Sequence, residues 1–341
     1  MNIADKAGYA ATLGIRELSH NFSPAPSFVT INPTFSCNLK CKMCNYWKIR
    51  QKEELCAVKW KKAISELKAW LGYFHLSICG GEPLLRPDIE EIIAFASGNK
   101  LMINLMTNGT LLNNSRINSL QESGLTSVTI SIDSGRKEFH DSLRGAAGTY
   151  DKVKEAIKDL RKTKMKIFLS SILIDPSPYS MRILLDMSKE TDGIYFQPLM
   201  VRMPTQHPGD KKFCARLPEK RQAAEAIEIL LKERSIGKIR NSLGQIRSMR
   251  RYYVEGIKEF PMLSCSSAHN LSISPKGDMY SCFFMGKIGN IGNGIKKSFM
   301  SDLGKKMRKD ISTCKKSCII MNCNYPENIG DRIRRFASIA H

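Results

Sequence analysis

The sequence contains no run of apolar residues that approaches the roughly 20 needed to span a bilayer. Its N-terminus also lacks the succession of basic, apolar and small residues that makes up a secretory signal peptide. We therefore predict a cytoplasmic protein that has no membrane partner. The 341 residues, of which 42% are hydrophobic, suffice for one large domain and a smaller appendage.

Acidic residues are scarce relative to basic ones, with 32 Asp and Glu against 53 Lys and Arg, so the formal net charge is +21. A charge of this size attracts polyanions or acidic substrates. The basic residues concentrate in two segments, 234–251 and 296–316. Neither segment has the interleaved aromatic side chains of a platform for single-stranded nucleic acid. We interpret both segments as solvated surface and predict no nucleic-acid partner; RNA binding stays an alternative that rests on charge alone.

Eleven cysteines in a chain without an export signal indicate metal or cluster binding rather than disulfide bonds. Cys37, Cys41 and Cys44 follow a short apolar run that ends at Pro33, so they occupy a loop that leaves a strand. Three thiols at this spacing can reach three corners of an iron–sulfur cubane, which usually takes four cysteines. The open iron can then accept a small molecule, as the open position of a catalytic zinc site does. The alternatives are a zinc site that lacks one ligand and three unrelated buried thiols.

Strand-like apolar runs alternate with helical patterns along the chain. The runs that we interpret as strands are 27–32, 73–79, 101–106, 126–132, 166–174 and 194–200. Between them, apolar residues recur at i, i+3, i+4 and i+7 after Pro87 and after Thr149, which we interpret as a helix N-cap. Such alternation predicts a parallel sheet built from right-handed βαβ units. In barrels of this kind the active site lies at the carboxyl ends of the strands.

The cysteine loop resembles the cluster motif of radical S-adenosylmethionine (SAM) enzymes, and Cys79-Gly-Gly-Glu-Pro83 and later stretches match that family in order. The resemblance covers residues 27–200 well and residues 263–323 in part. It implies an α/β fold, a partial (β/α)6 TIM-like barrel with a small C-terminal cysteine-rich cluster-binding extension. It also implies that the three loop cysteines hold a [4Fe–4S] cluster whose open iron binds SAM. One electron from the cluster then cleaves SAM to a 5′-deoxyadenosyl radical.

Four stretches at the predicted carboxyl ends of the strands carry the SAM contacts that the resemblance implies. Two glycines let the backbone approach a ligand, and a carboxylate can receive an ammonium group, which in the family is the methionine amino group of SAM. A serine hydroxyl and a guanidinium suit a carboxylate and ribose hydroxyls. For Arg144 the alternative is a surface ion pair with Asp141. The expected cofactor-binding residues are Gly80, Gly81, Glu82, Asn108, Ser131, Arg144 and Gln197.

Further cysteines gather towards the C-terminus. Cys265 and Cys282 flank a predicted β-hairpin with its turn at 275–278, a pattern similar to the opening of the SPASM/twitch extension of many radical SAM enzymes. That resemblance implies one auxiliary [4Fe–4S] cluster, with zinc as the alternative occupant. Its ligands are expected to be four of Cys265, Cys282, Cys314, Cys318 and Cys323.

The predicted organisation has four parts. They are an N-terminal helical segment at 1–26, the barrel at 27–204, a helix and basic bridge at 205–262, and the auxiliary-cluster region at 263–341. The first part is too short for a peptide-recognition domain, so a peptide substrate is expected to need a separate recognition protein. The expected electron donor is a flavodoxin- or ferredoxin-type reductant.

The resemblance implies an oxidoreductase-type or peptide-modifying radical SAM enzyme, with no catalytic residue assigned beyond the cluster. We expect the radical to abstract hydrogen from a peptide or protein, because the basic bridge suits an acidic leader peptide. A radical SAM dehydrogenase or epimerase of a small molecule, such as a sugar or a cofactor precursor, is the first alternative. The second is an iron–sulfur electron carrier, against which the missing fourth cysteine and the Gly-Gly-Glu motif argue.

Overall fold

The computed structural model describes residues 8, 11–12, 25–26, 28–49, 53–199, 217–234, 238–256, 266–282 and 284–314. The predicted N-terminal helical segment lies largely outside these residues. None of the described helices combines the length and the hydropathy needed to cross a membrane.

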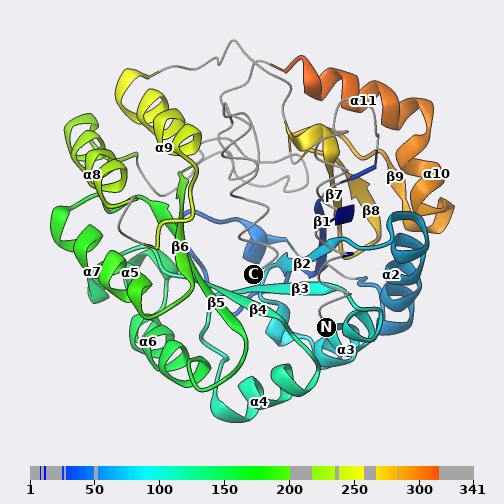
Figure 1. Cartoon of the computed structure of the whole chain (residues 1–341), viewed down its shortest axis with the longest axis horizontal. Coiled ribbons are helices and arrows are strands. Elements are labelled where there is room, and N and C mark those ends of the chain that lie inside the picture. Colours follow the sequence, from blue (N-terminus) through cyan, green and yellow to red (C-terminus); the bar gives the residue numbers. More distant parts are fainter. Residues whose placement is uncertain are drawn as a thin grey trace.

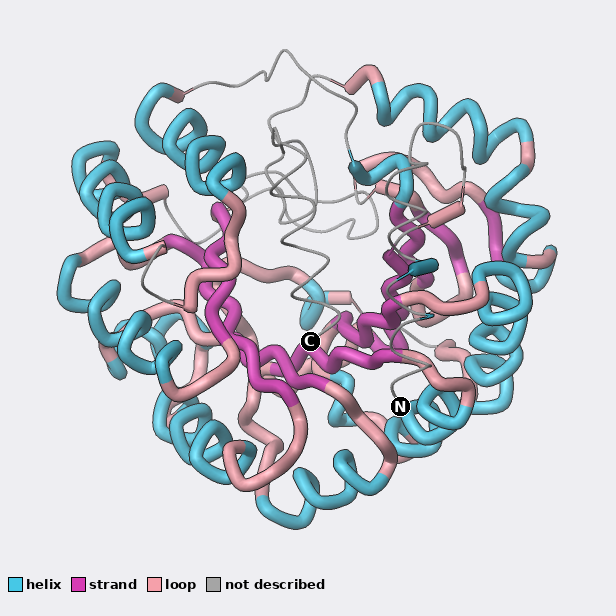
Figure 2. Tube along the Cα trace, in the orientation of Figure 1, coloured by secondary structure: helices cyan, strands magenta, loops and turns pink. Residues whose placement is uncertain are grey.

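A nine-stranded sheet in the order β6-β5-β4-β3-β2-β1-β7-β8-β9 forms the centre of the structure (Figure 1). Its first six strands are parallel and correspond to the six predicted ones. Their bounds are β1 Phe28–Thr34, β2 His75–Gly80, β3 Met102–Thr107, β4 Ser127–Ser131, β5 Lys166–Leu173 and β6 Gly193–Pro198. The sheet is curved, with helices along its convex side, and its end strands β6 and β9 do not pair within the described residues (Figure 2). The prediction of an open, partial (β/α)6 barrel is confirmed.

The helices that follow the strands bury the convex face of the sheet. Their bounds are α2 Ala57–Leu71, α3 Ile89–Gly98, α4 Asn114–Glu122, α5 Lys137–Arg144, α6 Thr149–Leu160, α7 Pro178–Lys189, α8 Lys220–Glu233, α9 Leu243–Arg250, α10 Ile295–Met300 and α11 Asp302–Ser312. Short turns of helix are η1 Tyr46–Lys48, η2 Pro83–Leu85, the π-helical η3 Arg251–Glu255, η4 Ser266–His269 and η5 Ile291–Asn293. Because successive strand residues point to opposite faces, Val128 and Ile130 of β4 are completely buried in one core with Val153 of α6.

The start of α6 differs from the prediction by one residue. Gly148 is the N-cap, with a φ of 77°, and Thr149 is the first helical residue. The Asp141 carboxylate accepts hydrogen bonds from the N–H groups of Gly148 (2.6 Å) and Tyr150 (2.8 Å), and from the Thr149 hydroxyl (2.6 Å). The prediction that Thr149 caps this helix is therefore wrong, because Asp141 of α5 satisfies the N–H groups that a capping side chain would have taken.

The described part of the basic bridge covers the free edge of β6. The Ile194 N–H donates to the Lys238 carbonyl and the Arg240 N–H donates to the Ile194 carbonyl, both at 2.9 Å. The Asn241 side chain pairs with the N–H and the C=O of Phe196 at 2.7 and 2.8 Å. These bonds occupy backbone groups that an open edge strand would otherwise offer to another chain.

The C-terminal region extends the barrel sheet. The bounds of its strands are β7 Asn270–Ile273, β8 Asp278–Tyr280 and β9 Gly289–Asn290. β7 is parallel to β1, and β8 is antiparallel to β7. The predicted turn at 275–278 is confirmed, since Gly277 has a φ of 83° and its N–H donates to the Ser274 carbonyl at 2.8 Å. The Asn32 side chain of β1 donates to the Ser272 hydroxyl at 3.0 Å, so side chains as well as backbone join the two parts.

Candidate functional site

The predicted cysteine loop follows the carboxyl end of β1. Cys41 is buried, Cys37 and Cys44 are half-buried, and all three are free thiols. The N–H groups of Leu39 and Tyr46 donate to the sulfurs of Cys37 and Cys44 at 3.5 and 3.4 Å. The three thiols pack in one small apolar cluster, so the structure brings them together as the sequence predicted.

This apolar cluster is separate from the main core and lies at the carboxyl ends of the strands. Its buried members are Leu39, Cys41, Met43, Leu143, Ile174 and Leu199. They come from the loop itself, from the last turn of α5 and from the residues that follow β5 and β6. The thiols are thereby shielded from water on several sides.

Burial raises the pKa of each loop thiol, and that of Cys44 to about 11. At Cys41 the Arg144 guanidinium acts in the opposite direction and favours the thiolate. No three His, Cys, Asp or Glu side chains of the described residues are arranged around a single metal ion. A [4Fe–4S] cluster is bound through several iron atoms, so its cysteines need not converge on one point. Three neighbouring thiols, one buried and two half-buried, beside a cation therefore fit such a cluster.

Arg144 forms a buried ion pair with Asp133. Its Nη2 lies 2.6 Å from Asp133 Oδ2, and the two side chains are 11% and 1% exposed. The other carboxylate oxygen accepts a hydrogen bond from the Ile172 N–H at 2.9 Å. The alternative that Arg144 pairs with Asp141 at the surface is therefore wrong. Arg144 Nε is buried without a hydrogen-bond partner in the part of the chain that the structure describes, so this donor is available to a ligand beside Cys41.

Gly80 and Gly81 pass close to the start of the cysteine loop. The Gly81 N–H donates to the Thr34 carbonyl at 2.9 Å, and the Glu82 N–H donates to the Ser36 carbonyl at 2.8 Å. A Cβ on Gly80 would lie 2.3 Å from the Thr34 oxygen, and one on Gly81 would lie 2.2 Å from the Ser36 oxygen. The glycines thus permit a close approach to the chain's own loop. Their contact with SAM stays a prediction.

Gly81→Ala is expected to displace the cysteine loop, because the added Cβ meets the backbone oxygen of Ser36 rather than a movable side-chain tip. We expect iron affinity roughly 10- to 100-fold lower, the usual cost of disturbing groups that orient metal ligands. Iron and sulfide content after anaerobic reconstitution at limiting iron measures this effect. Gly98→Ala is the control, since a Cβ there meets no atom within 4 Å. Equal cluster contents in the two variants would contradict the prediction.

Glu82 is completely buried and joins the carboxyl ends of β2 and β3. Its carboxylate accepts hydrogen bonds from the Leu84 N–H at 3.1 Å, the Thr107 hydroxyl at 2.8 Å and the Asn108 N–H at 2.8 Å. Burial raises the pKa of the carboxyl group, and these three donors act against that rise. The carboxylate is engaged within the chain, and its predicted contact with the SAM amino group stays a prediction.

Three other predicted residues lie at the same edge of the sheet. Asn108 Nδ2 donates to Asn38 Oδ1 at 2.9 Å and lies 3.9 Å from the Cys37 sulfur, so it faces the cysteine loop. Ser131 is half-buried at the end of β4. Gln197 of β6 donates to the hydroxyl of Ser170, the residue of β5 that pairs in register with Ser131.

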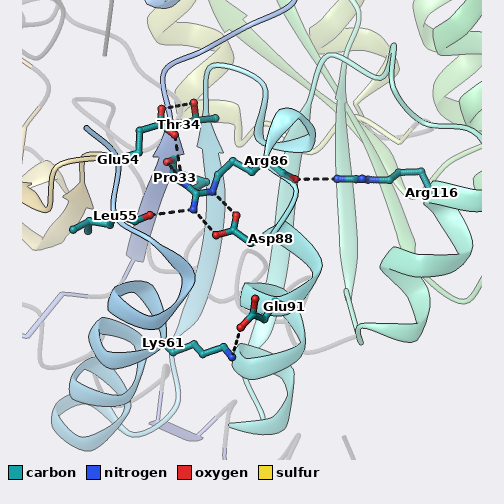
Figure 3. Close-up of polar contacts among 9 residues, drawn as sticks. All are labelled: Pro33, Thr34, Glu54, Leu55, Lys61, Arg86, Asp88, Glu91 and Arg116. Atoms are coloured by element: carbon teal, nitrogen blue, oxygen red, sulfur yellow. Dashed lines mark hydrogen bonds and ion pairs between the residues drawn. The ribbon is translucent and has the colours of Figure 1, made fainter. Parts of the chain in front are cut away.

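Sequence reasoning missed a polar network around Arg86 (Figure 3). The guanidinium forms ion pairs with Glu54 (3.2 Å) and Asp88 (2.7 Å), and it donates to the carbonyls of Pro33 (2.9 Å) and Leu55 (3.0 Å). It thereby ties the chain that follows the cysteine loop to the end of β1. A basic residue three positions after the Gly-Gly-Glu-Pro motif was the available signal, but apart from Asp88 its partners lie far away along the chain.

Arg86→Met is expected to lower the free energy of unfolding by about 3 kcal/mol, the low end of the cost of removing one partner from a buried ion pair. The reason is that Glu54 and Asp88 lose their common counter-charge. Lys61→Met is the control: it removes the pair with the half-exposed Glu91 in the same view and should cost less than about 1 kcal/mol. Urea unfolding measures both variants, and equal losses would count against the network.

Two of the five cysteines predicted for the auxiliary cluster are described, Cys282 and Cys314, and both are half-buried. Outside the described residues lie Cys265, Cys318 and Cys323. Cys282 packs against Ala268 and Ile311 in a small apolar cluster. The Cys314 N–H donates to the Ile311 carbonyl at 3.1 Å, at the end of α11. Helix α11 therefore connects the surroundings of the two thiols, and the ligand set stays a prediction.

Residues 31–180 match the family model described as Radical SAM superfamily. An AdoMet-dependent heme synthase of Methanosarcina barkeri is 29% identical over 174 residues, which are 50% of this chain and 50% of the relative. A PqqA peptide cyclase of Bradyrhizobium diazoefficiens is 30% identical over 170 residues, which are 49% of this chain and 44% of the relative. The chain spans about half the length of the curated relatives it matches.

Among solved structures, the chain is similar to SuiB of Streptococcus suis bound to S-adenosylmethionine, with a TM-score of 0.68. The sequence identity is 17%, and the match covers 86% of this chain and 70% of SuiB. SuiB has also been solved with the precursor peptide SuiA bound. At this identity the similarity concerns the fold alone.

Proposed function

We propose that residues 31–180, which match the Radical SAM superfamily model, form a radical SAM domain, and that the chain is an enzyme that cleaves S-adenosylmethionine reductively. The 5′-deoxyadenosyl radical so formed takes a hydrogen atom from a substrate. The observation that carries the proposal is the set of three free thiols, Cys37, Cys41 and Cys44, in one apolar cluster beside the buried Arg144 guanidinium. These thiols would hold a [4Fe–4S] cluster, which when bound would supply the electron for cleavage of the S–C5′ bond of SAM.

The chain's own residues bind and orient SAM in this proposal. We assign the SAM carboxylate to Arg144, whose Nε has no partner among the described residues, and to the Ser131 hydroxyl. The ion pair with Asp133 keeps the guanidinium in place. The backbone at Gly80 and Gly81 runs along the loop that carries the thiols. The apolar cluster around the thiols excludes water from the site.

Three other residues that we propose as SAM contacts lie at the carboxyl ends of the strands. Asn108 lies against the cysteine loop, where its amide can reach the cofactor. Gln197 lies at the carboxyl end of β6, and we assign it to the ribose or adenine of SAM. Glu82 joins the ends of two strands, and we assign it to the SAM amino group, directly or through the backbone that it orders.

We also propose one auxiliary [4Fe–4S] cluster in the C-terminal region. Cys282 follows the hairpin that pairs with β1, and α11 connects its surroundings to Cys314. Two clusters contain about eight irons per chain, whereas zinc at the auxiliary site would leave about four irons with zinc present. Metal analysis after anaerobic reconstitution distinguishes the two occupants.

We propose a peptide or protein as the substrate. The sequence similarity to a PqqA peptide cyclase and the fold similarity to a protein solved with a precursor peptide support this choice. The similarity to a heme synthase makes a small molecule the second candidate. A flavodoxin- or ferredoxin-type reductant and a separate peptide-recognition protein are the partners we propose, in the reducing environment of the cytoplasm.

The test is an assay of 5′-deoxyadenosine after anaerobic reconstitution and addition of dithionite and SAM. We expect deoxyadenosine to form at a basal rate and to form faster when substrate is present. An iron–sulfur electron carrier would bind no SAM and would form none. Intact clusters without deoxyadenosine, whether or not a peptide pool is added, would contradict the proposal.

A further inference from the structure

The barrel strands bury one mainly apolar face, whereas the opposite face mixes polar side chains with apolar ones such as Met102 and Met106 of β3. In β4, Val128 and Ile130 are completely buried in the core that the helices cover. Ser127, Thr129 and Ser131 alternate with them and therefore point to the concave side of the sheet. Figure 2 shows that the helices lie along the outer side of the curve, away from this concave face.

Charged residues are almost absent from these strands. β1 to β6 contain a single lysine, Lys166 at the exposed start of β5, and no arginine, aspartate or glutamate. His75 of β2 is neutral at pH 7, because burial lowers its pKa to about 4. The whole chain carries a formal charge of +21, so the six strands are an almost uncharged part of a strongly basic protein; the nearby cations are Lys166, in register with Ser127, and Arg240, whose guanidinium lies 5.7 Å from the Phe168 ring.

Asn104 of β3 is held so that its amide nitrogen is free. The hydroxyls of Ser127 and Thr129 donate to Asn104 Oδ1 at 3.0 and 2.9 Å. Its Nδ2 has no hydrogen-bond partner among the described residues, and the side chain is only half-buried. Two hydroxyls thus orient the amide and leave both of its N–H donors to a ligand.

Asn104 lies deeper in the barrel than the residues proposed to bind SAM. It pairs in register with Ser127, which is four residues before Ser131 on β4. At about 3.3 Å per residue, the level of Asn104 and the level of Ser131 are about 13 Å apart along the strands. A substrate segment that lies between SAM and the floor of the barrel therefore comes within reach of this amide.

We propose that the concave face binds the reacting segment of the substrate as a neutral stretch of polypeptide rich in amide and hydroxyl groups, with Asn104 donating to one of its carbonyl oxygens. This inference rests on the proposed function and specifies the substrate of the same site. The two N–H groups on one nitrogen suit a carbonyl acceptor, which a polypeptide offers at every residue.

Other substrate classes match this face less well. The carboxylates of a tetrapyrrole or of an acidic segment would find a single cation on the six strands, Lys166, which already pairs with Asp192 at 3.3 Å. An aliphatic segment would cover the Asn104 amide without satisfying it. In both cases polar groups lose water and gain no partner, which weakens binding.

The test is a selection of random decapeptides by mRNA display on the anaerobically reconstituted full chain with SAM present. The parent is expected to enrich sequences whose central positions are Ser, Thr, Asn, Gln or Gly. Asn104→Asp keeps the acceptor for the hydroxyls of Ser127 and Thr129 but replaces the donor by a charged oxygen. This variant should enrich central Lys or Arg roughly five-fold over the parent, the factor given by one hydrogen bond.

Asn114→Asp, at an exposed asparagine of α4, is the matched control and should select the same sequences as the parent. The inference is overturned if the parent enriches acidic or aliphatic segments, if it enriches nothing, or if Asn104→Asp selects as the parent does. An assay of deoxyadenosine formation by the same preparations distinguishes failure of this inference from failure of the proposed function. Deoxyadenosine with an unchanged selection rejects this inference alone, and its absence from the parent rejects the proposed function.

Discussion

Cys41→Ala is expected to reduce 5′-deoxyadenosine formation to background while the chain stays folded. Cys41 is the one buried residue among the three loop cysteines, and the Arg144 guanidinium favours its thiolate. Its removal leaves only two thiols in the loop for a cluster that usually takes four cysteines. Deoxyadenosine is measured after anaerobic reconstitution with dithionite and SAM, and circular dichroism reports whether the fold is retained.

Cys56→Ala is the matched control for this experiment. Cys56 is exposed just before α2, and its side chain makes no capping hydrogen bond there. The control should keep the iron content of the parent and its yield of deoxyadenosine. Retained deoxyadenosine production by Cys41→Ala would disprove the role that we assign to the cysteine loop.

The second large effect is expected at Arg144. Arg144→Met removes a donor for the SAM carboxylate, so the Kd for SAM should rise roughly 10- to 150-fold, the factor for a hydrogen bond of about 1.5–3 kcal/mol to a charged group. The substitution also leaves Asp133, which is 1% exposed, without its counter-charge. Breaking a buried pair in this way costs about 3–5 kcal/mol of unfolding free energy. Equilibrium SAM binding and urea unfolding measure the two effects.

A double variant separates the binding role of Arg144 from its structural role. Arg144→Met combined with Asp133→Asn removes both charges, so most of the lost stability should return. The affinity for SAM should stay low, because the guanidinium is still absent. Arg161→Met, which removes an exposed pair with Glu190, should change neither property. Recovery of SAM affinity in the double variant would show that Arg144 acts only through its pair with Asp133.

The barrel strands could be predicted from the sequence because their signal is local. Val128 and Ile130 alternate with Ser127 and Thr129, and this period of two is visible in the chain itself. The C-terminal hairpin was predictable for a similar reason, since Gly277 supplies the positive φ that its turn requires. The three loop cysteines were predictable because their spacing alone places them on one loop.

Partners that are distant along the chain could not be predicted. Asp141 is three residues before Arg144, and this spacing on a helix favours an ion pair. In the structure the Asp141 carboxylate accepts hydrogen bonds from N–H groups at the start of α6, and Arg144 forms its ion pair with the buried Asp133 instead. Competition of this kind depends on how α5 and α6 meet, which no local pattern reveals.

The same limit applies to the glycine motif and to Arg86. The sequence suggested that Gly80 and Gly81 approach a ligand, whereas the structure shows their close approach to the carbonyls of Thr34 and Ser36. The network of Arg86 likewise joins segments that meet only in the folded barrel. Residues that bind a ligand and residues that shape its site therefore carry the same local signal.

Electron paramagnetic resonance of the dithionite-reduced chain, recorded with and without SAM, tests the central claim most directly. The claim is that the cysteine loop holds a cluster with one open iron, to which SAM binds. We predict that SAM shifts the g values of the reduced-cluster signal in the parent and leaves them unchanged in Cys41→Ala. A parent with intact clusters whose spectrum does not respond to saturating SAM would contradict the account.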